Sequence, residues 1–169
     1  MKNRCVFLDR DGVINKERGE YTYLIKDFIL CDGVRESVKL LKEKGFIVIV
    51  ITNQAGISKG IYTRADMMNC HEYLISEVKE IEAIYYSPYH PNQTESLSRK
   101  PDSLLFEKAM ARYDINPENS WMVGDRERDL IPAKKFNMQT VLIGEDVTVY
   151  ADFKTLNLSS AVKDIILAE

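Results

Sequence analysis

The stretch Phe46–Asn53 reads FIVIVITN: six apolar residues, mostly β-branched, followed at once by two polar ones. An unbroken apolar run of this length is typical of a strand buried on both faces of a parallel sheet. A shorter run, Val6 to Leu8, comes earlier in the chain and ends at Asp9. The two runs predict a parallel sheet whose strands end in polar residues.

Helical patterns alternate with these strands. Apolar residues recur at helical spacing after Asp32, the expected N-cap, and Gly45 ends that pattern. A capping box at Thr63 predicts another helix, on which His71 is expected to be a partly exposed surface residue. Further strands are expected near residues 83–86, 120–123 and 140–143, and further helices near residues 103–113, 129–136 and from 159 onward. This alternation predicts an α/β doubly wound fold, with a mostly parallel sheet and helices on both faces.

Length and composition limit the classes of protein that fit. The 169 residues correspond to one domain, residues 1–169. No apolar stretch approaches the roughly 20 residues that span a bilayer, and the run after Met1 breaks at Asp9, so we expect no membrane segment and no signal peptide. A pI near 5.5 gives no broad electrostatic reason to bind nucleic acid. Three cysteines without metal-ligand spacing indicate reduced thiols in a cytoplasmic protein. We also expect the protein to be a monomer.

Four sets of polar residues follow predicted strands or the loop after one. They are Asp9 with Asp11, Thr52 with Asn53, Arg99 with Lys100, and Asp125 with Arg126 and Asp129. A single set of this kind is also explained by a turn or a helix cap. Because parallel sheets place ligands beyond the carboxyl ends of their strands, four sets in one chain indicate a common site.

These residue types fit phosphoryl transfer through a covalent aspartyl phosphate. Asp9 can attack phosphorus, and Asp11 can protonate the leaving oxygen. The Thr52 hydroxyl and the Lys100 ammonium can stabilise charge on the phosphate oxygens. Because carboxylate and phosphate repel each other, a hard cation must bridge them, and Mg²⁺ suits such oxygen ligands. We expect Asp9, Asp11 (by its backbone carbonyl) and Asp125 to hold the metal.

The four sets lie in segments that resemble the motifs of haloacid-dehalogenase-type phosphatases. The segments are Phe7–Asn15 (FLDRDGVIN), Thr52–Ile57 (TNQAGI), Arg99–Pro101 (RKP) and Val123–Arg126 (VGDR). More narrowly, they resemble the group of heptose-bisphosphate and histidinol-phosphate phosphatases, over about residues 4–145. The resemblance implies a Rossmann-like fold without a large cap domain. It also implies these roles: nucleophile Asp9, general acid and base Asp11, phosphate stabilisers Thr52 and Lys100, and Mg²⁺ ligand Asp125.

The expected substrate is a small phosphorylated sugar. Asn53, Arg99, Arg126 and Lys59 are the candidate substrate-binding residues. Because spare cations suit a second anionic group, the sequence favours a bisphosphorylated sugar. The resemblance then implies removal of the 7-phosphate from D-glycero-D-manno-heptose 1,7-bisphosphate. Asp129 has three open roles: orienting Lys100, orienting a metal-bound water, or capping a helix.

Two alternatives remain for the function. The first is a histidinol-phosphate phosphatase, which would use the same chemistry. The second is a phospho-accepting receiver domain, which also uses Asp, Thr and Lys at strand ends. In a receiver, however, no carboxylate strand follows the lysine, whereas here Asp125 comes after Lys100.

One departure from the resembled group concerns a structural zinc. That group usually carries a Cys-x-His pair after the third strand and a Cys-x-Cys just before Arg-Lys-Pro. Here the four positions hold Ser87, Tyr89, Ser96 and Ser98. His90 remains, but a lone imidazole without thiolates is a poor zinc site. The sequence therefore predicts that the zinc is absent.

Overall fold

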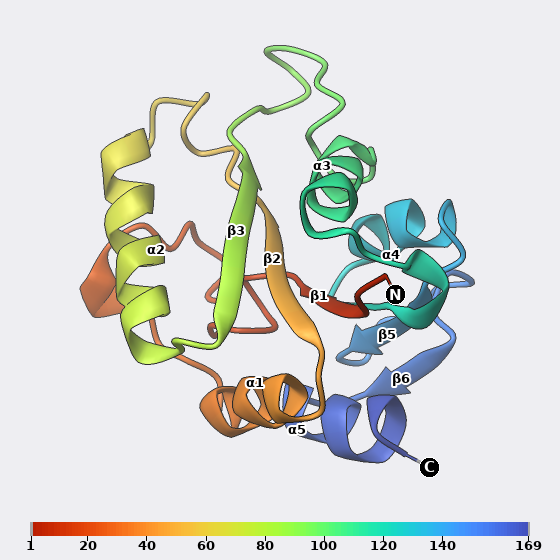
Figure 1. Ribbon diagram of the computed structural model, residues 1–169. Coiled ribbons are helices and arrows are strands. Elements are labelled where there is room, and N and C mark those ends of the chain that lie inside the picture. The colour runs from red at the N-terminus through yellow and green to blue at the C-terminus, as the bar shows by residue number, and fades with distance from the viewer. Residues whose placement is uncertain (1, 169) are drawn as a thin grey trace.

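The computed structural model describes residues 2–168 and contains a six-stranded sheet in the order β3-β2-β1-β4-β5-β6 (Figure 1). Every pair of neighbouring strands is parallel, as predicted. The strands are β1 (Cys5–Leu8), β2 (Ile47–Asn53), β3 (Ile81–Ser87), β4 (Trp121–Gly124), β5 (Gln139–Ile143) and β6 (Phe153–Thr155).

Helices cover both faces of the sheet, which confirms the doubly wound fold (Figure 1). One face carries α1 (Val34–Glu43), α2 (Arg64–Glu77) and α5 (Leu158–Ser160), which continues as a π-helix at Ala161–Ile166. The other face carries α3 (Leu104–Tyr113) and α4 (Glu127–Lys134). Short 3₁₀ helices lie at Ile25–Asp27 and Pro117–Asn119. Within residues 2–168, no helix has the length and apolar character to cross a membrane.

The central strand β1 supplies side chains to both halves of the core. Val6 and Leu8 pack with the side chains of α1 and α2, whereas Cys5 and Phe7 pack with those of α3 and α4. All four are fully buried, and the Phe7 ring lies 5.2 Å from the ring of Phe106 on α3. The two-residue period of a strand therefore fills two cores at once, as expected for a strand with helices on both sides.

The order of the strands fixes where a ligand can bind. From β1 the chain moves outward to β2 and β3, and then returns to the other side of β1 for β4, β5 and β6. The order thus reverses between β1 and β4, and their carboxyl ends open into one crevice. Asp9 follows β1 and Asp125 follows β4, so the topology brings the first and last motif carboxylates together.

The structure confirms one of two predicted helix N-caps and contradicts the other. The capping box of α2 forms as predicted, with the Thr63 N–H donating to Asp66 Oδ2 at 2.8 Å and the Asp66 N–H donating to Thr63 Oγ1 at 3.1 Å. The prediction that Asp32 caps α1 was wrong. The N-cap is Gly33, whose φ of 75° is left-handed, and no side chain caps the helix. Glycine adopts this conformation without the steric cost that a Cβ would impose, and the chain enters α1 from an angle that Asp32 cannot cap.

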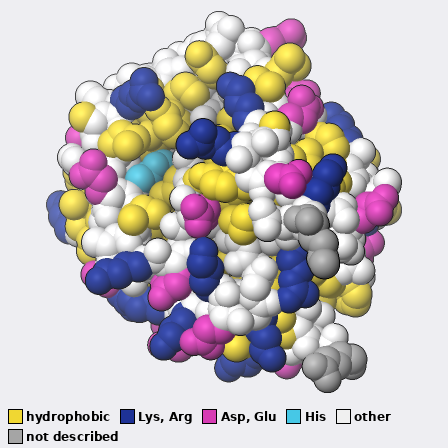
Figure 2. All heavy atoms as spheres, viewed as in Figure 1, with side chains coloured by type: hydrophobic (Ala, Val, Ile, Leu, Met, Phe, Trp, Pro, Cys, Tyr) yellow, Lys and Arg dark blue, Asp and Glu magenta, His cyan; other side chains and the backbone are white. Residues whose placement is uncertain are grey.

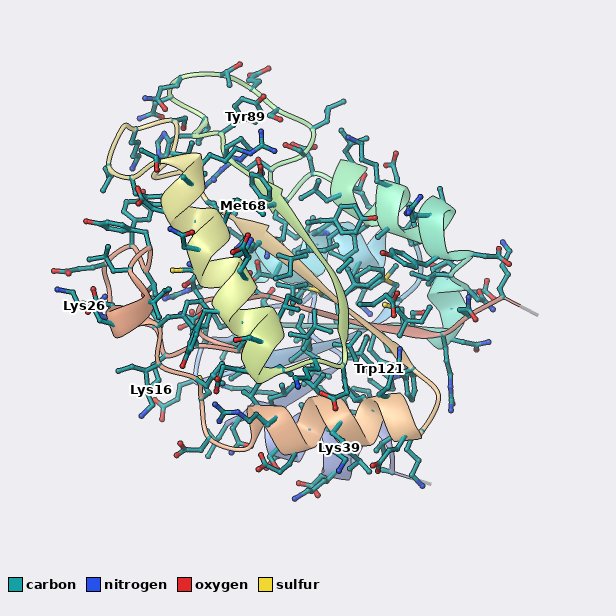
Figure 3. The ribbon with its side chains drawn as sticks, turned by 60° about the vertical axis from the view of Figure 1, so that its left-hand side comes forward. Lys16, Lys26, Lys39, Met68, Tyr89 and Trp121 are labelled. Atoms are coloured by element: carbon teal, nitrogen blue, oxygen red, sulfur yellow. The ribbon has the colours of Figure 1, made fainter. Side chains whose placement is uncertain are left out.

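The outer side of the molecule between α2 and β3 carries an apolar groove. Figure 2 shows hydrophobic side chains gathered there among charged ones, and Figure 3 shows Met68 on α2. Met68 and Ile75 are partly exposed in this groove, whereas Met67 and Leu74 on the same helix are fully buried. The strand β3 forms this edge of the sheet because nothing pairs with its outer side among the described residues.

Candidate active site

The side chain of Lys100 organises the carboxyl end of the sheet. The loop between β3 and α3 carries it, and its Nζ lies 2.7 Å from Asp9 Oδ1, 2.7 Å from Asp129 Oδ1 and 2.7 Å from the carbonyl oxygen of Ile51. The side chain is 1% exposed. An ammonium has three donors, and all three have an oxygen in reach here.

Asn53, at the end of β2, holds the backbone of this lysine. Its Nδ2 donates to the Lys100 carbonyl at 3.0 Å, and its Oδ1 accepts from the Lys100 N–H at 3.0 Å. The sequence predicts that Asn53 binds substrate. In the structure, its side-chain amide holds the backbone of Lys100 in place. The neighbouring Thr52 is buried, and its hydroxyl oxygen accepts a hydrogen bond from Gln54 Nε2 at 2.9 Å.

Three carboxylates converge around the lysine. Oxygen atoms of Asp9, Asp125 and Asp129 lie within 4.8 Å of one another. Burial first, and then the charges of Asp129 and Asp125, raise the pKa of Asp9 to about 7, although Lys100 opposes the shift. Burial and the charge of Asp129 raise the pKa of Asp125 to about 6. Burial alone would lower the pKa of Lys100, but Asp129 and Asp9 reverse this and raise it.

This cluster suits a hard divalent cation. Burial, and then repulsion among the three acidic groups, raise the pKa values of Asp9 and Asp125, and a further positive charge at the cluster would offset both effects. The donors are all carboxylate oxygens, which Mg²⁺ prefers. Asp129 is the least available of the three, because its Oδ1 meets Lys100 and its Oδ2 accepts the Arg126 N–H at 3.0 Å. It therefore fills two of the three roles that the sequence left open: orienting Lys100 and capping α4.

Two glycines allow the carboxylates to come this close. A Cβ on Gly12, where φ is +86°, would lie 2.3 Å from Asp125 Oδ2. A Cβ on Gly124 would lie 2.4 Å from the Cβ of Asp129. Any larger residue at either position would push an acidic side chain away, so both glycines are needed for space, and Gly12 is needed for its backbone conformation as well.

The carboxylate of Asp11 lies outside this cluster. Its Oδ1 accepts from Arg10 Nη2 at 3.0 Å and from Asn15 Nδ2 at 2.9 Å. Its Oδ2 accepts from Arg10 Nε at 3.1 Å and from Gln54 Nε2 at 3.2 Å. The structure thus brings Asp9 and Asp125 together with Asp129, and holds the Asp11 side chain apart on a ring of donors.

Arg10, which sequence reasoning passed over, is buried behind Asp11. Its Nη2 also donates to the Thr22 carbonyl at 2.7 Å, and its Nη1 lies 3.3 Å from His71 Nε2. The expectation that His71 lies partly at the surface was wrong, since it is 4% exposed. Burial and the nearby Arg10 lower the pKa of His71 to about 3, so the neutral ring accepts a hydrogen bond from the guanidinium. An arginine between two motif aspartates was the available signal, because a buried guanidinium requires partners.

The other predicted substrate-binding cations are farther from the reacting centre or already engaged. Lys59 Nζ lies 5.6 Å from the centre of the Tyr21 ring. Arg99 Nη1 donates to the Tyr89 carbonyl at 3.0 Å. Arg126 borders the crevice, where its guanidinium lies 3.4 Å from Asp125 Oδ2 and 3.4 Å from Asp146.

The crevice has a narrow and a wide part. The narrow part, about 30 Å³, is lined by the acidic cluster, Lys100 and Thr52. The wide part, about 390 Å³, extends toward Tyr21 and Arg126. Four residues line both parts and mark their junction: Asp11, Glu17, Asn53 and Arg128. Glu17 and Arg128 lie outside the short motifs that the sequence analysis relied on.

The four positions considered for zinc lie at the end of β3 and in the loop between β3 and α3, where Figure 3 labels Tyr89. Three of them form a chain of hydroxyl groups. Ser98 Oγ donates to Ser87 Oγ at 2.9 Å, and the hydroxyls of Ser96 and Ser98 lie 2.8 Å apart. Neutral hydroxyls bonded to one another replace the charged thiolates that a structural zinc site uses.

Comparisons with known proteins agree with this site. The chain is 30% identical to the D-glycero-β-D-manno-heptose-1,7-bisphosphate 7-phosphatase of Haemophilus ducreyi over 98% of each chain. It is 35% identical to the α-heptose counterpart of Burkholderia mallei, covering 85% of this chain and 80% of the relative. The chain belongs to this family of phosphatases.

Two further comparisons place the family and its fold. A HAD-hydrolase-like family model matches residues 97–165. The fold is similar to a solved structure of D,D-heptose 1,7-bisphosphate phosphatase from B. bronchiseptica complexed with magnesium and phosphate, with a TM-score of 0.87 and 21% identity. That alignment covers 96% of this chain and 98% of the other. The heptose-bisphosphate phosphatase fold thus extends over nearly the whole chain.

The Lys100 ion cluster leads to a stability prediction for this family member. Lys100→Met leaves Asp9 and Asp129 buried without a counter-charge, so we expect it to lower the free energy of unfolding by about 3–5 kcal/mol at pH 8. The loss should be smaller at pH 5, because burial raises the pKa of Asp9 and the folded variant then takes up a proton at Asp9 that its unfolded chain binds less readily. Urea unfolding at the two pH values measures both.

The control is Lys134→Met, which breaks the ion pair with Asp152 on the surface. Lys134 is 31% exposed, so this change should cost about 1 kcal/mol or less. An equal loss for Lys100→Met at pH 5 and pH 8 would contradict the electrostatic account and indicate lost packing instead.

Proposed function

We propose that the protein is a Mg²⁺-dependent phosphatase that removes the 7-phosphate from D-glycero-D-manno-heptose 1,7-bisphosphate through an aspartyl phosphate on Asp9. The observation that carries this proposal is the contact between Lys100 Nζ and Asp9 Oδ1 beside Asp125, at the point where the strand order reverses. The family relationship adds the sugar, since both relatives compared above are named for this heptose bisphosphate.

Asp9 is the proposed nucleophile. Lys100 donates to Oδ1, which leaves Oδ2 as the oxygen that forms the bond to phosphorus. The same ammonium lowers the pKa of Asp9 against burial, so it helps to keep the attacking carboxylate ionised. The buried Thr52 hydroxyl can donate to a phosphoryl oxygen, and the nearby positive charge of Lys100 can stabilise the negative charge that develops on these oxygens.

Asp11 is the proposed general acid and base. When the phosphorus–oxygen bond to the sugar breaks, Asp11 gives its proton to the leaving sugar oxygen. In the second step Asp11 takes a proton from the water that attacks the aspartyl phosphate, and inorganic phosphate leaves. For both transfers the side chain must turn from Arg10 and Gln54 toward the crevice, which it also lines.

The metal ligands proposed are Asp9, Asp125 and Asp11, the last through its backbone carbonyl. Mg²⁺ bound there would offset the repulsion between the nucleophile and the phosphate dianion. The similar structure from B. bronchiseptica carries magnesium and phosphate, which supports this choice of metal.

We also infer a cytoplasmic monomer with neither a nucleic acid nor a membrane partner. A pI near 5.5 and three free cysteines support this inference. Every residue of the proposed site comes from one chain, so catalysis does not require a second copy.

Two substitutions test the covalent mechanism. Asp9→Asn should abolish turnover while the protein stays folded, because an amide is a poor nucleophile. Asp11→Asn should still bind Mg²⁺ and should lose roughly a hundredfold to ten-thousandfold in kcat, the usual contribution of a general acid. Steady-state kinetics with thermal unfolding as the folding control measures both. Near-native turnover in Asp9→Asn would rule out the aspartyl phosphate.

The metal requirement is tested separately. Activity should disappear with a chelator and return when Mg²⁺ is added. Ca²⁺ should inhibit, because its larger and looser coordination shell disturbs in-line geometry. Full activity in chelator, with no metal detected in the protein, would contradict the proposed site.

We further propose that the loop after β3 holds no zinc. The hydroxyl chain of Ser87, Ser98 and Ser96 supports this, because the donors already satisfy one another. Elemental analysis of the purified protein should find no stoichiometric zinc. One tightly held zinc ion per chain would overturn the prediction.

The substrate is tested by comparing heptose 1,7-bisphosphate, in both anomers, with histidinol phosphate. We expect kcat/KM to be highest for the bisphosphate, since the cations around the crevice repel the amine of histidinol phosphate. A clear preference for histidinol phosphate would reject the heptose substrate and leave the phosphatase chemistry intact.

A further inference from the structure

The two parts of the crevice divide a substrate into two ends. The narrow part around Asp9 has about 30 Å³ and accepts the reacting phosphoryl group. The rest of a sugar phosphate must extend through the junction into the wide part, about 390 Å³, which falls in the range of small-molecule sites. A second phosphate would therefore meet cations at the junction or in the wide part.

Most cations in this region already have partners. The Arg10 guanidinium is buried and bonded to Asp11 and to the Thr22 carbonyl, so its charge is neutralised. Arg126 lies between two carboxylates, those of Asp125 and Asp146. A phosphate at either guanidinium would share its positive charge with carboxylates that are already paired to it.

Two further cations stand outside both parts of the crevice. Lys59 lies over the Tyr21 ring, and Arg99 donates to the Tyr89 carbonyl. Neither residue lines the narrow or the wide part. Both can add to the local positive potential, but the lining of the crevice gives them no direct contact with a ligand held there.

Arg128 differs from all of these. It lines the narrow and the wide part, and it is exposed on the first turn of α4. No ion pair or side-chain hydrogen bond joins it to another residue between 2 and 168. Burial, and then the charge of Arg128, lower the pKa of Arg99, so the two guanidinium groups are near enough to repel each other.

We propose that Arg128 binds the phosphate of the bisphosphate substrate that is not hydrolysed, and so determines the preference for a bisphosphate over a monophosphate. This inference rests on the proposed function. The planar guanidinium can form two parallel hydrogen bonds to phosphate oxygens. Its place at the junction puts it beside the path from the reacting phosphoryl group to the wide part.

Glu17 lines the same junction as Arg128 and suits a different part of the substrate. It lines the same two parts, and a carboxylate repels phosphate but accepts hydrogen bonds from sugar hydroxyls. The sugar hydroxyls would then face Glu17, and the distal phosphate would face Arg128. A monophosphate leaves Arg128 without a partner and gains nothing from it.

The experiment compares two substrates that share the reacting phosphate: heptose 1,7-bisphosphate and heptose 7-phosphate. Each is assayed with the wild type, with Arg128→Gln and with Arg112→Gln. Arg112 is an exposed arginine near the end of α3 that lines neither part of the crevice, so its variant controls for the loss of one positive charge. Arg128→Lys keeps the charge without the planar fork and should recover part of the effect.

The expected result for Arg128→Gln is a rise in KM for the bisphosphate with kcat little changed, and a fall of about tenfold to a hundredfold in the preference for bisphosphate over monophosphate. Heptose 7-phosphate should be hydrolysed as before. An equal loss on both substrates would overturn the inference, because Arg128 would then serve the reacting phosphoryl group.

Two further outcomes are separated by the wild type. If the wild type prefers the bisphosphate and Arg128→Gln keeps that preference, the role of Arg128 is rejected and the proposed function stands. If the wild type hydrolyses both substrates equally well, the bisphosphate specificity itself is rejected, and the role of Arg128 falls with it. Thermal unfolding should show both glutamine variants as stable as the wild type, since neither arginine is buried.

Discussion

The buried ammonium of Lys100 is the interaction on which the site depends. Three carboxylates would not stay within 4.8 Å of one another in a low-dielectric pocket without a positive charge among them. Lys100 neutralises part of that charge, and its third donor is bound to the carbonyl of Ile51 at the end of β2. The lysine therefore ties the loop after β3 to the central strands, and Asn53 fixes its backbone from the same strand.

The parallel sheet explains why these groups can meet at all. Carboxyl ends of parallel strands lie at one edge, and the reversal between β1 and β4 opens a crevice there. Burial in that crevice raises the pKa values of Asp9 and Asp125, so the cluster is costly for the protein alone and favourable once a cation is present. The same feature that destabilises the site thus prepares it for a metal and a phosphate.

The position of the Asp11 side chain depends on several hydrogen bonds. Four hydrogen bonds from Arg10, Asn15 and Gln54 hold its carboxylate beside the crevice, away from the acidic cluster. Behind it, the neutral His71 on α2 receives the guanidinium of Arg10. This arrangement keeps the Asp11 carboxylate at the lining of the crevice without adding a fourth carboxylate to the cluster. The contact between Arg10 and His71 also joins α2 to the loop that follows β1.

The parallel sheet and the residues at its carboxyl end follow from the pattern of the sequence alone. The reason is that an apolar run such as residues 46–51 forms a strand with both of its faces buried. The polar residues that follow such a run therefore lie at the end of the strand. The sequence pattern misjudged Asp32 and His71, because the entry angle of a helix and the burial of one polar side chain depend on what packs against them.

Which side chains the residues of the site contact depends on the packing of the whole chain. His71 meets Arg10 from 61 residues away, and Asn53 meets the backbone of Lys100 from 47 residues away. Arg128 lies at the junction of the crevice because α4 begins directly after β4 and turns its first residues toward the site. Such contacts leave no local pattern in the chain, since they arise from the direction of side chains after the sheet and helices have packed.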